Sequence, residues 1–150
     1  MTTPSLSTPA DATETPNVSV LLRRHGLRCT PSRLHILALL SSSELHLSSA
    51  ETWAELDRRG TPYDQATVYR TLETLTAAGL IHAVHGPGPK RYGVSSETHH
   101  HAVCEQCGQV NALTDEGLGE AVERVAELAG LKPGAAGSLL IYGRCVRCGE

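Results

Sequence analysis

The first half of the chain repeats apolar residues with the period of an α-helix. A short apolar stripe over residues 18–22 ends near Gly26. The stretch "TPSRLHILALL" follows, in which Thr30 is placed to cap a helix and Pro31 to occupy its first position. The residues predicted to form the buried face of this helix are Leu34, Leu37 and Ala38.

Two more helices are marked by their ends. "SSAE", residues 48–51, has the pattern of a capping box and opens a helix that ends at Gly60 and carries Ala50, Trp53 and Ala54. Asp64 is placed to cap "QATVYRTLETLTAAG", which Gly79 ends. The apolar face of that helix consists of Val68, Leu72 and Leu75.

The pattern then changes to short strands. "LIHAV" (80–84) and "KRYGV" (90–94) are joined by "HGPGP", whose glycines and prolines favour a chain reversal. Helices followed by a small hairpin predict a winged helix-turn-helix domain over residues 17–94. In that fold the last helix before the wing enters the major groove of DNA.

A second module is predicted over residues 99–150, after a linker at 95–98. It combines strands near 99–104, 109–113 and "SLLIYG" with a helix from about Asp115 to Ala129, whose apolar stripe is Leu118, Val122, Val125 and Ala129. Such a small sheet has edges that invite pairing with a second subunit. The overall fold class is therefore α+β: a winged helix followed by a small α/β dimerisation domain. Residues 1–16 have the composition of a disordered tail.

Charge supports the division into two modules. The 150 residues carry a net charge of −3, but residues 17–94 hold nine Lys/Arg and six Asp/Glu, a balance of +3, whereas 95–150 hold four and eight, a balance of −4. A basic first module is suited to phosphate. No apolar run approaches a membrane span and no signal peptide is visible, so we expect a cytoplasmic protein with reduced thiols and no membrane partner.

Four of the five cysteines form two Cys-x-x-Cys pairs, Cys104/Cys107 and Cys145/Cys148, each followed by glycine. Two such knuckles supply the four thiolates of a structural Zn²⁺ site. A redox Cys-x-x-Cys normally occurs once, at the start of a helix in a thioredoxin-like pattern, which this chain lacks. Cys29 stands alone and is predicted to be a small buried residue rather than a ligand.

The histidines suggest a second metal site. Side chains alternate along a strand, so His99 and His101 share one face while His100 points the other way. Together with His46 or His82 they would hold a metal between the two modules. His85 at the wing turn is a weaker candidate for the fourth ligand.

These segments resemble the ferric uptake regulator family of bacterial metal-responsive repressors. The stretches that carry the resemblance run from about residue 18 to the end of the chain: "LRCTPSRLHILALL", "HLSSAETWAEL", "ATVYRTLETLTAAGLIHAV", "RYGVSSETHHHAVCEQCGQV" and "LLIYGRCVRCG". The resemblance implies a homodimer that binds A/T-rich palindromic DNA when loaded with a regulatory metal. It also implies that the cysteines hold structural zinc and that the regulatory site includes His46, His99 and His101, with His82 where zinc-sensing members place an Asp or His ligand. The DNA contacts implied are Arg28 in the minor groove and Thr67, Tyr69 and Arg70 on the recognition helix, which is the last helix before the wing. Of these, Tyr69 would contact a base methyl group and Arg70 a phosphate or a base edge.

The chain departs from the family pattern at two carboxylate positions. Iron and peroxide sensors place acidic ligands where this sequence has Gly93 and Ala112. A further site of some members falls on Gly119 and Gly137, so no third site is expected. Losing oxygen ligands while keeping imidazoles favours Zn²⁺ as the regulatory metal, with Ni²⁺ or Co²⁺ as alternatives, over Mn²⁺ or Fe²⁺.

Other functions are weaker hypotheses. A peroxide-sensing repressor of the same family and a metal carrier or redox switch without DNA binding both stay open. An enzyme with a small-molecule substrate is not expected, because the His-x-Glu of zinc deaminases, a Ser/His/Asp order and a Gly-rich phosphate loop are all missing.

Overall fold

The structure is a computed structural model that describes residues 17–43, 46–94, 99–132 and 139–149. The predicted tail and linker lie outside these residues. The helices are α1 (Val18–Arg24), α2 (Pro31–Ser42), α3 (Ser49–Arg58), α4 (Gln65–Ala77) and α5 (Glu116–Leu128). The strands are β1 (Leu47–Ser48), β2 (Ile81–Val84), β3 (Arg91–Val94), β4 (His100–Cys104), β5 (Val110–Leu113) and β6 (Leu140–Gly143).

The helices begin where side chains satisfy their first free N–H groups. Thr30 accepts a hydrogen bond from the Arg33 N–H at the start of α2, and Asp64 accepts one from Thr67 at the start of α4. Ser48 and Glu51 form the predicted capping box of α3 in both directions. These local contacts define the starts of three helices.

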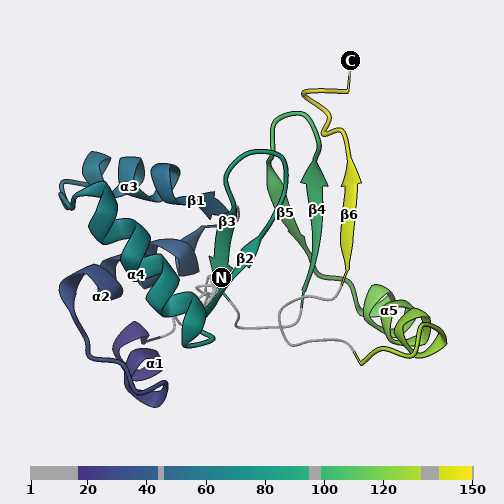
Figure 1. Ribbon diagram of the computed structural model, residues 1–150, viewed down its shortest axis with the longest axis horizontal. Helices are drawn as coiled ribbons and strands as arrows, with labels where there is room; N and C mark the ends of the chain where they lie inside the picture. The colour runs from purple at the N-terminus through teal and green to yellow at the C-terminus, as the bar shows by residue number, and fades with distance from the viewer. Residues whose placement is uncertain (1–16, 44–45, 95–98, 133–138, 150) are drawn as a thin grey trace, which may run out of the picture.

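The first four helices and one small sheet form the winged helix (Figure 1). In this wing sheet the strand order is β1-β3-β2, with β3 antiparallel to both neighbours. The pairing of β2 with β3 confirms the predicted hairpin, whereas β1 was not predicted because two residues are too short to show a pattern. Within the described residues no helix combines the length and the apolar character needed to cross a bilayer.

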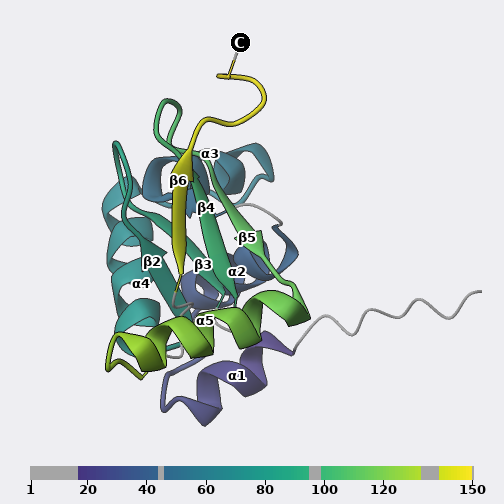
Figure 2. The same cartoon turned by 90° about the vertical axis from the view of Figure 1, so that its right-hand side faces the viewer.

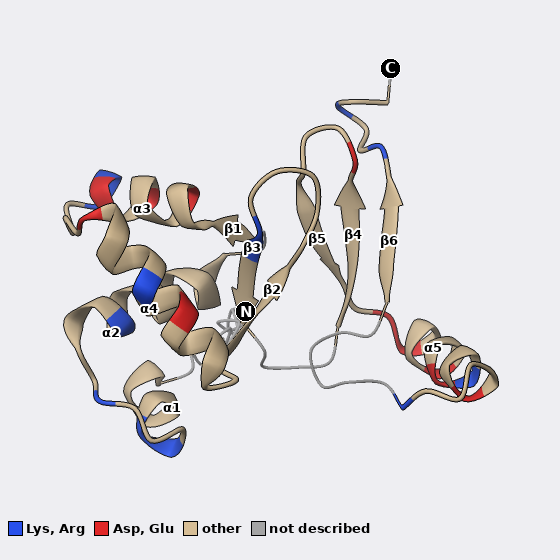
Figure 3. Cartoon of the chain, viewed as in Figure 1, with Lys and Arg blue, Asp and Glu red and all other residues tan. Residues whose placement is uncertain are grey.

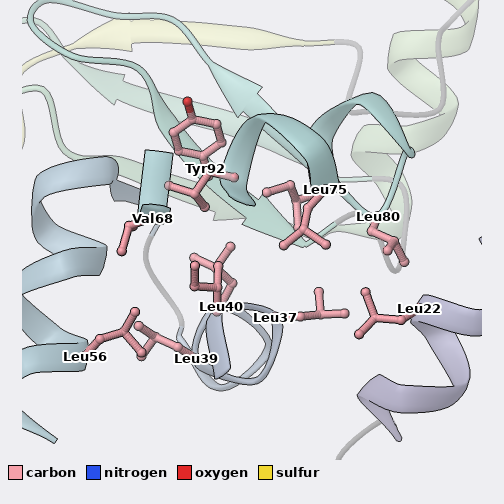
Figure 4. Packing of buried hydrophobic residues seen from close by; sticks show 12 residues of the cluster. Leu22, Leu37, Leu39, Leu40, Leu56, Val68, Leu75, Leu80 and Tyr92 are labelled. Atoms are coloured by element: carbon pink, nitrogen blue, oxygen red, sulfur yellow. The ribbon is translucent and has the colours of Figure 1, made fainter. Parts of the chain in front are cut away.

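The core of the winged helix is rich in leucine (Figure 4). On α4 the predicted face of Val68, Leu72 and Leu75 is confirmed, since all three are fully buried. The predicted face of α2 was partly wrong: Leu34 and Ala38 are half-buried. The residues of α2 that are buried are Ile36, Leu37, Leu39 and Leu40. On α3, Ala50 and Ala54 are exposed, and the helix buries Thr52 and Leu56 instead.

A second sheet lies beside the wing (Figures 1 and 2). Its strand order is β5-β4-β6, with β5 antiparallel and β6 parallel to β4. Helix α5 runs across the end of this C-terminal sheet and buries only Val122 among its described residues. The two sheets meet through a small inter-sheet cluster, Val84 of β2 with Val103 of β4 and Val110 of β5. This contact brings the wing and the predicted ligand strand β4 together.

Candidate metal centres and DNA-binding surface

Four buried imidazoles converge between the two sheets. His46 precedes β1, His82 lies in β2, His99 immediately precedes β4 and His101 lies within it. Their candidate ligand atoms all lie within 4.8 Å of one another. We call these four residues the histidine cluster.

The Nε2 contacts in the histidine cluster exceed what hydrogen bonding allows. The His82 Nε2 atom lies 2.8 Å from that of His46, 2.9 Å from that of His101 and 3.1 Å from that of His99. One imidazole nitrogen carries either a single hydrogen or a single lone pair, so it cannot satisfy three such neighbours. Zn–N bonds of about 2.0–2.1 Å would separate tetrahedral nitrogens by about 3.3–3.4 Å, close to these distances. The arrangement therefore fits a shared cation.

The surroundings of three of these rings keep them in the form that binds metal. The four side chains are between 1% and 7% exposed. Burial, with a smaller contribution from neighbouring imidazoles, lowers the pKa of His46 to about 3 and that of His82 and His101 to about 4. His46, His82 and His101 are thus neutral at neutral pH, as metal binding requires.

Gly93 supplies the space that the histidine cluster occupies. It pairs with His82 across β2 and β3. A Cβ atom built on Gly93 would lie 2.3 Å from Nε2 of His46 and 2.5 Å from Cδ2 of the same ring. The sequence showed only that a carboxylate was absent here. The structure shows that the His46 ring fills the space that a side chain would need.

The remaining histidines lie apart from this cluster. His85 is exposed at the wing turn, so the geometry selects His82 rather than His85 as the fourth member. His25 and His35 are exposed, and Nδ1 of His35 lies 2.7 Å from the Tyr63 hydroxyl. His100 belongs to neither cluster, as predicted, although it is only 4% exposed and its Nδ1 has no hydrogen-bond partner.

The four paired cysteines form a second cluster at the end of the C-terminal sheet. Their sulfur atoms lie within 4.8 Å of one another, and Sγ of Cys107 is 3.8 Å from Sγ of Cys145. Tetrahedral Zn–S bonds of about 2.3 Å would give a sulfur–sulfur distance of about 3.8 Å. This cysteine cluster consists of Cys104, Cys107, Cys145 and Cys148.

Backbone N–H groups of the two knuckles stabilise the thiolate form of the cysteine cluster at Cys104. Sγ of Cys104 accepts hydrogen bonds from the N–H groups of Cys107 at 3.5 Å and Cys145 at 3.4 Å. These N–H groups lower the pKa of Cys104 to about 6, which favours the thiolate that binds metal. Gly108 has φ +75°, and a Cβ there would also meet the carbonyl oxygen of Pro87 at 2.8 Å. Cys29, by contrast, is half-buried, and its sulfur lies 3.5 Å from the carbonyl oxygen of Ser19.

The predicted DNA contacts lie on the surface of the winged helix. On α4, Tyr69 is 48% exposed and Arg70 is exposed, whereas Thr67 is half-buried. Arg28 is exposed in the loop between α1 and α2. Figure 3 shows basic residues on α1, α2 and α4, acidic residues on α3 and α4 as well, and a mainly acidic α5. The residues that give the first module its net positive charge thus lie on the winged helix.

A winged helix joined to two clusters of candidate metal ligands is typical of metal-responsive DNA-binding regulators, and comparison with known proteins specifies the family. The ferric uptake regulator family model matches residues 24–136. The ferric uptake regulation protein of Legionella pneumophila is 37% identical over 131 residues, covering 85% of this chain and 95% of that protein. The chain therefore belongs to the ferric uptake regulator family.

Two further similarities show the range within the family. The peroxide operon regulator of Bacillus subtilis (strain 168) is 31% identical over 130 residues, covering 86% of this chain and 89% of that protein. The structure of the ferric uptake regulator from Pseudomonas aeruginosa with manganese matches with a TM-score of 0.70 and 29% identity, covering 87% of this chain and 98% of that one. These relatives confirm the predicted fold class and the general role of a metal-dependent transcriptional repressor.

Proposed function

We propose that this protein represses metal homeostasis genes as a cytoplasmic homodimer that binds A/T-rich inverted repeats of double-stranded DNA when its histidine cluster is metal-loaded. One observation carries the proposal: a buried set of four imidazoles is divided between the wing and the C-terminal sheet. In this proposal Arg28, Thr67, Tyr69 and Arg70 contact the DNA.

The regulatory step follows from the position of the histidine cluster. His46 and His82 belong to the winged helix (residues 17–94), whereas His99 and His101 belong to the dimerisation domain (residues 99–150). These four imidazoles would hold a divalent cation, and the bound cation would cross-link the wing to the C-terminal sheet. The residues then hold the wing at one angle to the C-terminal sheet, which fixes the separation of the two recognition helices in a dimer. The loss of conformational entropy on ordering the two domains is then compensated by metal binding and not by DNA binding. The affinity for the DNA site, the operator, therefore rises.

The cysteine cluster has a different proposed role. It joins the chain beyond β6 to the turn between β4 and β5, next to an inter-sheet cluster that consists, among the described residues, of three buried valines. Structural Zn²⁺ bound there would stabilise a domain whose own core is small. We therefore assign the non-exchanging zinc to the cysteine cluster and the exchangeable metal to the histidine cluster.

The chemistry of the histidine cluster favours Zn²⁺ as the exchangeable metal. All four described donors are imidazole nitrogens, which suit Zn²⁺ better than Mn²⁺ or Fe²⁺. Ala112 pairs with His101 across β4 and β5 and offers no donor, and the space at Gly93 is filled by His46. The same absence of carboxylates disfavours the peroxide-sensing alternative.

A small change at Gly93 tests this donor set. In Gly93→Ala the new methyl group must displace the His46 ring, so exchangeable Zn²⁺ affinity is expected to fall about 10–100-fold, as when groups that orient metal ligands are disturbed. Competition with a zinc-binding dye measures the change. Gly143→Ala is the matched control, because a Cβ on this strand glycine meets no atom within 4 Å. Equal affinities in the two variants would contradict the role assigned to Gly93.

Homodimerisation is supported by apolar surface on the C-terminal domain. On α5, Val125 is 61% exposed and Leu128 is 84% exposed, although the helix is amphipathic. Strand β6 lies at an edge of its sheet, and its side chains Leu140, Ile141 and Tyr142 are 44–48% exposed. A free strand edge beside apolar side chains is suited to pairing with a second copy of the chain.

The proposed function is tested by DNA binding under metal-buffered conditions. The metal-loaded protein selects duplexes from a randomised pool, and the affinity for the selected duplex is titrated with Zn²⁺, Mn²⁺, Fe²⁺ and Ni²⁺. We expect an A/T-rich inverted repeat, one permanently bound zinc per chain and one exchangeable metal that raises affinity, with Zn²⁺ acting at the lowest free concentration. A metal carrier or redox switch would select no sequence at any metal concentration.

A further inference from the structure

A network of three side chains joins the wing to helix α4. The Glu73 carboxylate of α4 accepts a hydrogen bond from the Tyr92 hydroxyl at 2.6 Å and pairs with the Lys90 ammonium group, also at 2.6 Å. Both contacts use the same carboxylate oxygen, Oε1. Lys90 immediately precedes β3 and Tyr92 lies within it, so both residues that contact the Glu73 carboxylate come from the wing.

Tyr92 makes the network rigid. It lies in the central strand of the wing sheet, opposite Leu47 on one side and Ala83 on the other, and it is only 1% exposed. Figure 4 shows its ring beside α4, with the hydroxyl pointing away from the labelled leucines. Because Tyr92 is fixed by the core, the carboxylate that it contacts is held in place despite being 40% exposed.

Lys90 connects this network to the proposed base-contacting tyrosine. Its ammonium nitrogen lies 5.8 Å from the centre of the Tyr69 ring and 5.6 Å from the centre of the Tyr92 ring, within the range of cation–π attraction. Tyr69 and Glu73 are four residues apart on α4 and so lie on the same face of the helix. The Tyr69 ring also borders an open groove of about 520 Å³ between the first turns of α3 and α4 and the wing. A ring beside such a space has room to turn away from the DNA unless something holds it.

Lys90 could have either of two roles: it could contact a DNA phosphate, or it could hold the Tyr69 ring. A lysine on a DNA-binding surface commonly pairs with phosphate. Here the carboxylate of Glu73 already neutralises it, and hydrogen bonds from Lys90 and Tyr92 lower the pKa of Glu73 so that the carboxylate stays ionised. An ionised carboxylate on the recognition helix would repel DNA, which makes its presence costly unless it has a structural task.

We propose that Glu73 and Lys90 are positioning residues that lock the wing to the recognition helix and hold the Tyr69 ring in the orientation that contacts a base. The inference rests on the proposed DNA-binding function, and it assigns Lys90 to Tyr69 rather than to phosphate. Glu73 acts through Lys90, and Lys90 acts through the Tyr69 ring.

The two roles predict opposite results for Glu73→Gln. If the network positions Tyr69, this variant and Lys90→Met each weaken binding to the selected duplex by about 5–10-fold, as loss of a cation–π contact with its supporting ion pair implies. The salt dependence of DNA binding in both variants then stays as in the wild type. Lys90→Arg, which keeps the positive charge, binds the duplex with wild-type affinity. If Lys90 contacts phosphate, Glu73→Gln tightens binding and Lys90→Met lowers the salt slope by about one. Either of these last two results overturns the proposal.

Two further measurements complete the test. The double variant should lose no more affinity than either single variant, because both changes break one network. Glu55→Gln is the matched control: it removes a carboxylate from α3 that pairs with Arg58 and Arg59, away from Tyr69. The NMR resonances of the Tyr69 ring, measured without DNA, should shift in Lys90→Met and not in Glu55→Gln. Unchanged ring resonances overturn the positioning role even if DNA binding fails, whereas shifted resonances with no selected duplex for the wild type would count against the proposed function alone.

Discussion

Replacing His99 and His101 together by alanine is expected to abolish metal-dependent DNA binding while leaving the protein folded. The change removes two of the four donors of the histidine cluster, both on the C-terminal side of the domain contact. The two imidazoles that remain belong to the winged helix, so a bound metal would no longer cross-link the domains. The ratio of DNA affinity with metal to DNA affinity without metal, which is typically about 5–150 for an allosteric effector, should therefore fall to about one.

The measurement is operator affinity with and without buffered Zn²⁺, together with total zinc and circular dichroism. The variant should keep one zinc per chain, since the cysteine cluster is untouched. His85→Ala is the matched control, because this imidazole is exposed and outside both clusters. Undiminished metal dependence in a folded double variant would remove the regulatory role of the histidine cluster.

Much of the fold could be predicted because its signals are local. The capping box at Ser48 and Glu51 and the cap at Asp64 each place a helix start through contacts three residues apart. The pairs of cysteines predicted their cluster for the same reason, since each knuckle is complete within four residues. Only the meeting of the two knuckles depended on the fold.

The buried faces of helices were predicted wrongly where other elements contact a helix on several sides or where its partner is outside the single chain. Helix α2 contacts α1, α3, α4 and β3, so burial extends around it and no single stripe describes its buried face. The apolar stripe of α5 was predicted correctly as a pattern, yet Val125 is exposed in the single chain. In the proposed dimer Val125 would pack against a second copy of the chain, and the sequence of one chain does not show where that copy lies.

The histidine cluster could be predicted in part. Strand alternation paired His99 with His101, but the choice between His82 and His85 depended on where the hairpin turned. The role of Gly93 depended on a ring that lies 47 residues earlier in the sequence and fills the space above it. The network of Glu73, Lys90 and Tyr92 was not predicted at all, because nothing local in the sequence links a helix carboxylate to a lysine in the next hairpin.

The cysteine cluster carries the second large prediction. Replacing Cys145 by serine is expected to remove the permanently bound zinc and unfold the C-terminal domain. Structural zinc in small zinc-finger peptides contributes about 10–16 kcal/mol of apparent binding free energy, which matches or exceeds the total stability of about 5–15 kcal/mol typical of a domain. A core with few buried side chains cannot replace it. The zinc content should fall from two sites to one or none, and the dimer should dissociate in size-exclusion chromatography.

Hydrogen exchange locates the damage. Amides of β4 and β5 should lose protection in Cys145→Ser, because the knuckles hold the ends of these strands, whereas amides of α2 and α4 should keep it, since their leucine core lies in the winged helix. Cys29→Ser is the matched control, a thiol-to-hydroxyl change outside the cysteine cluster. If Cys145→Ser retained its zinc and its protected β4 amides, the fold would not depend on the metal. The thiols would then be free for the redox role that the spacing alone made the weaker hypothesis.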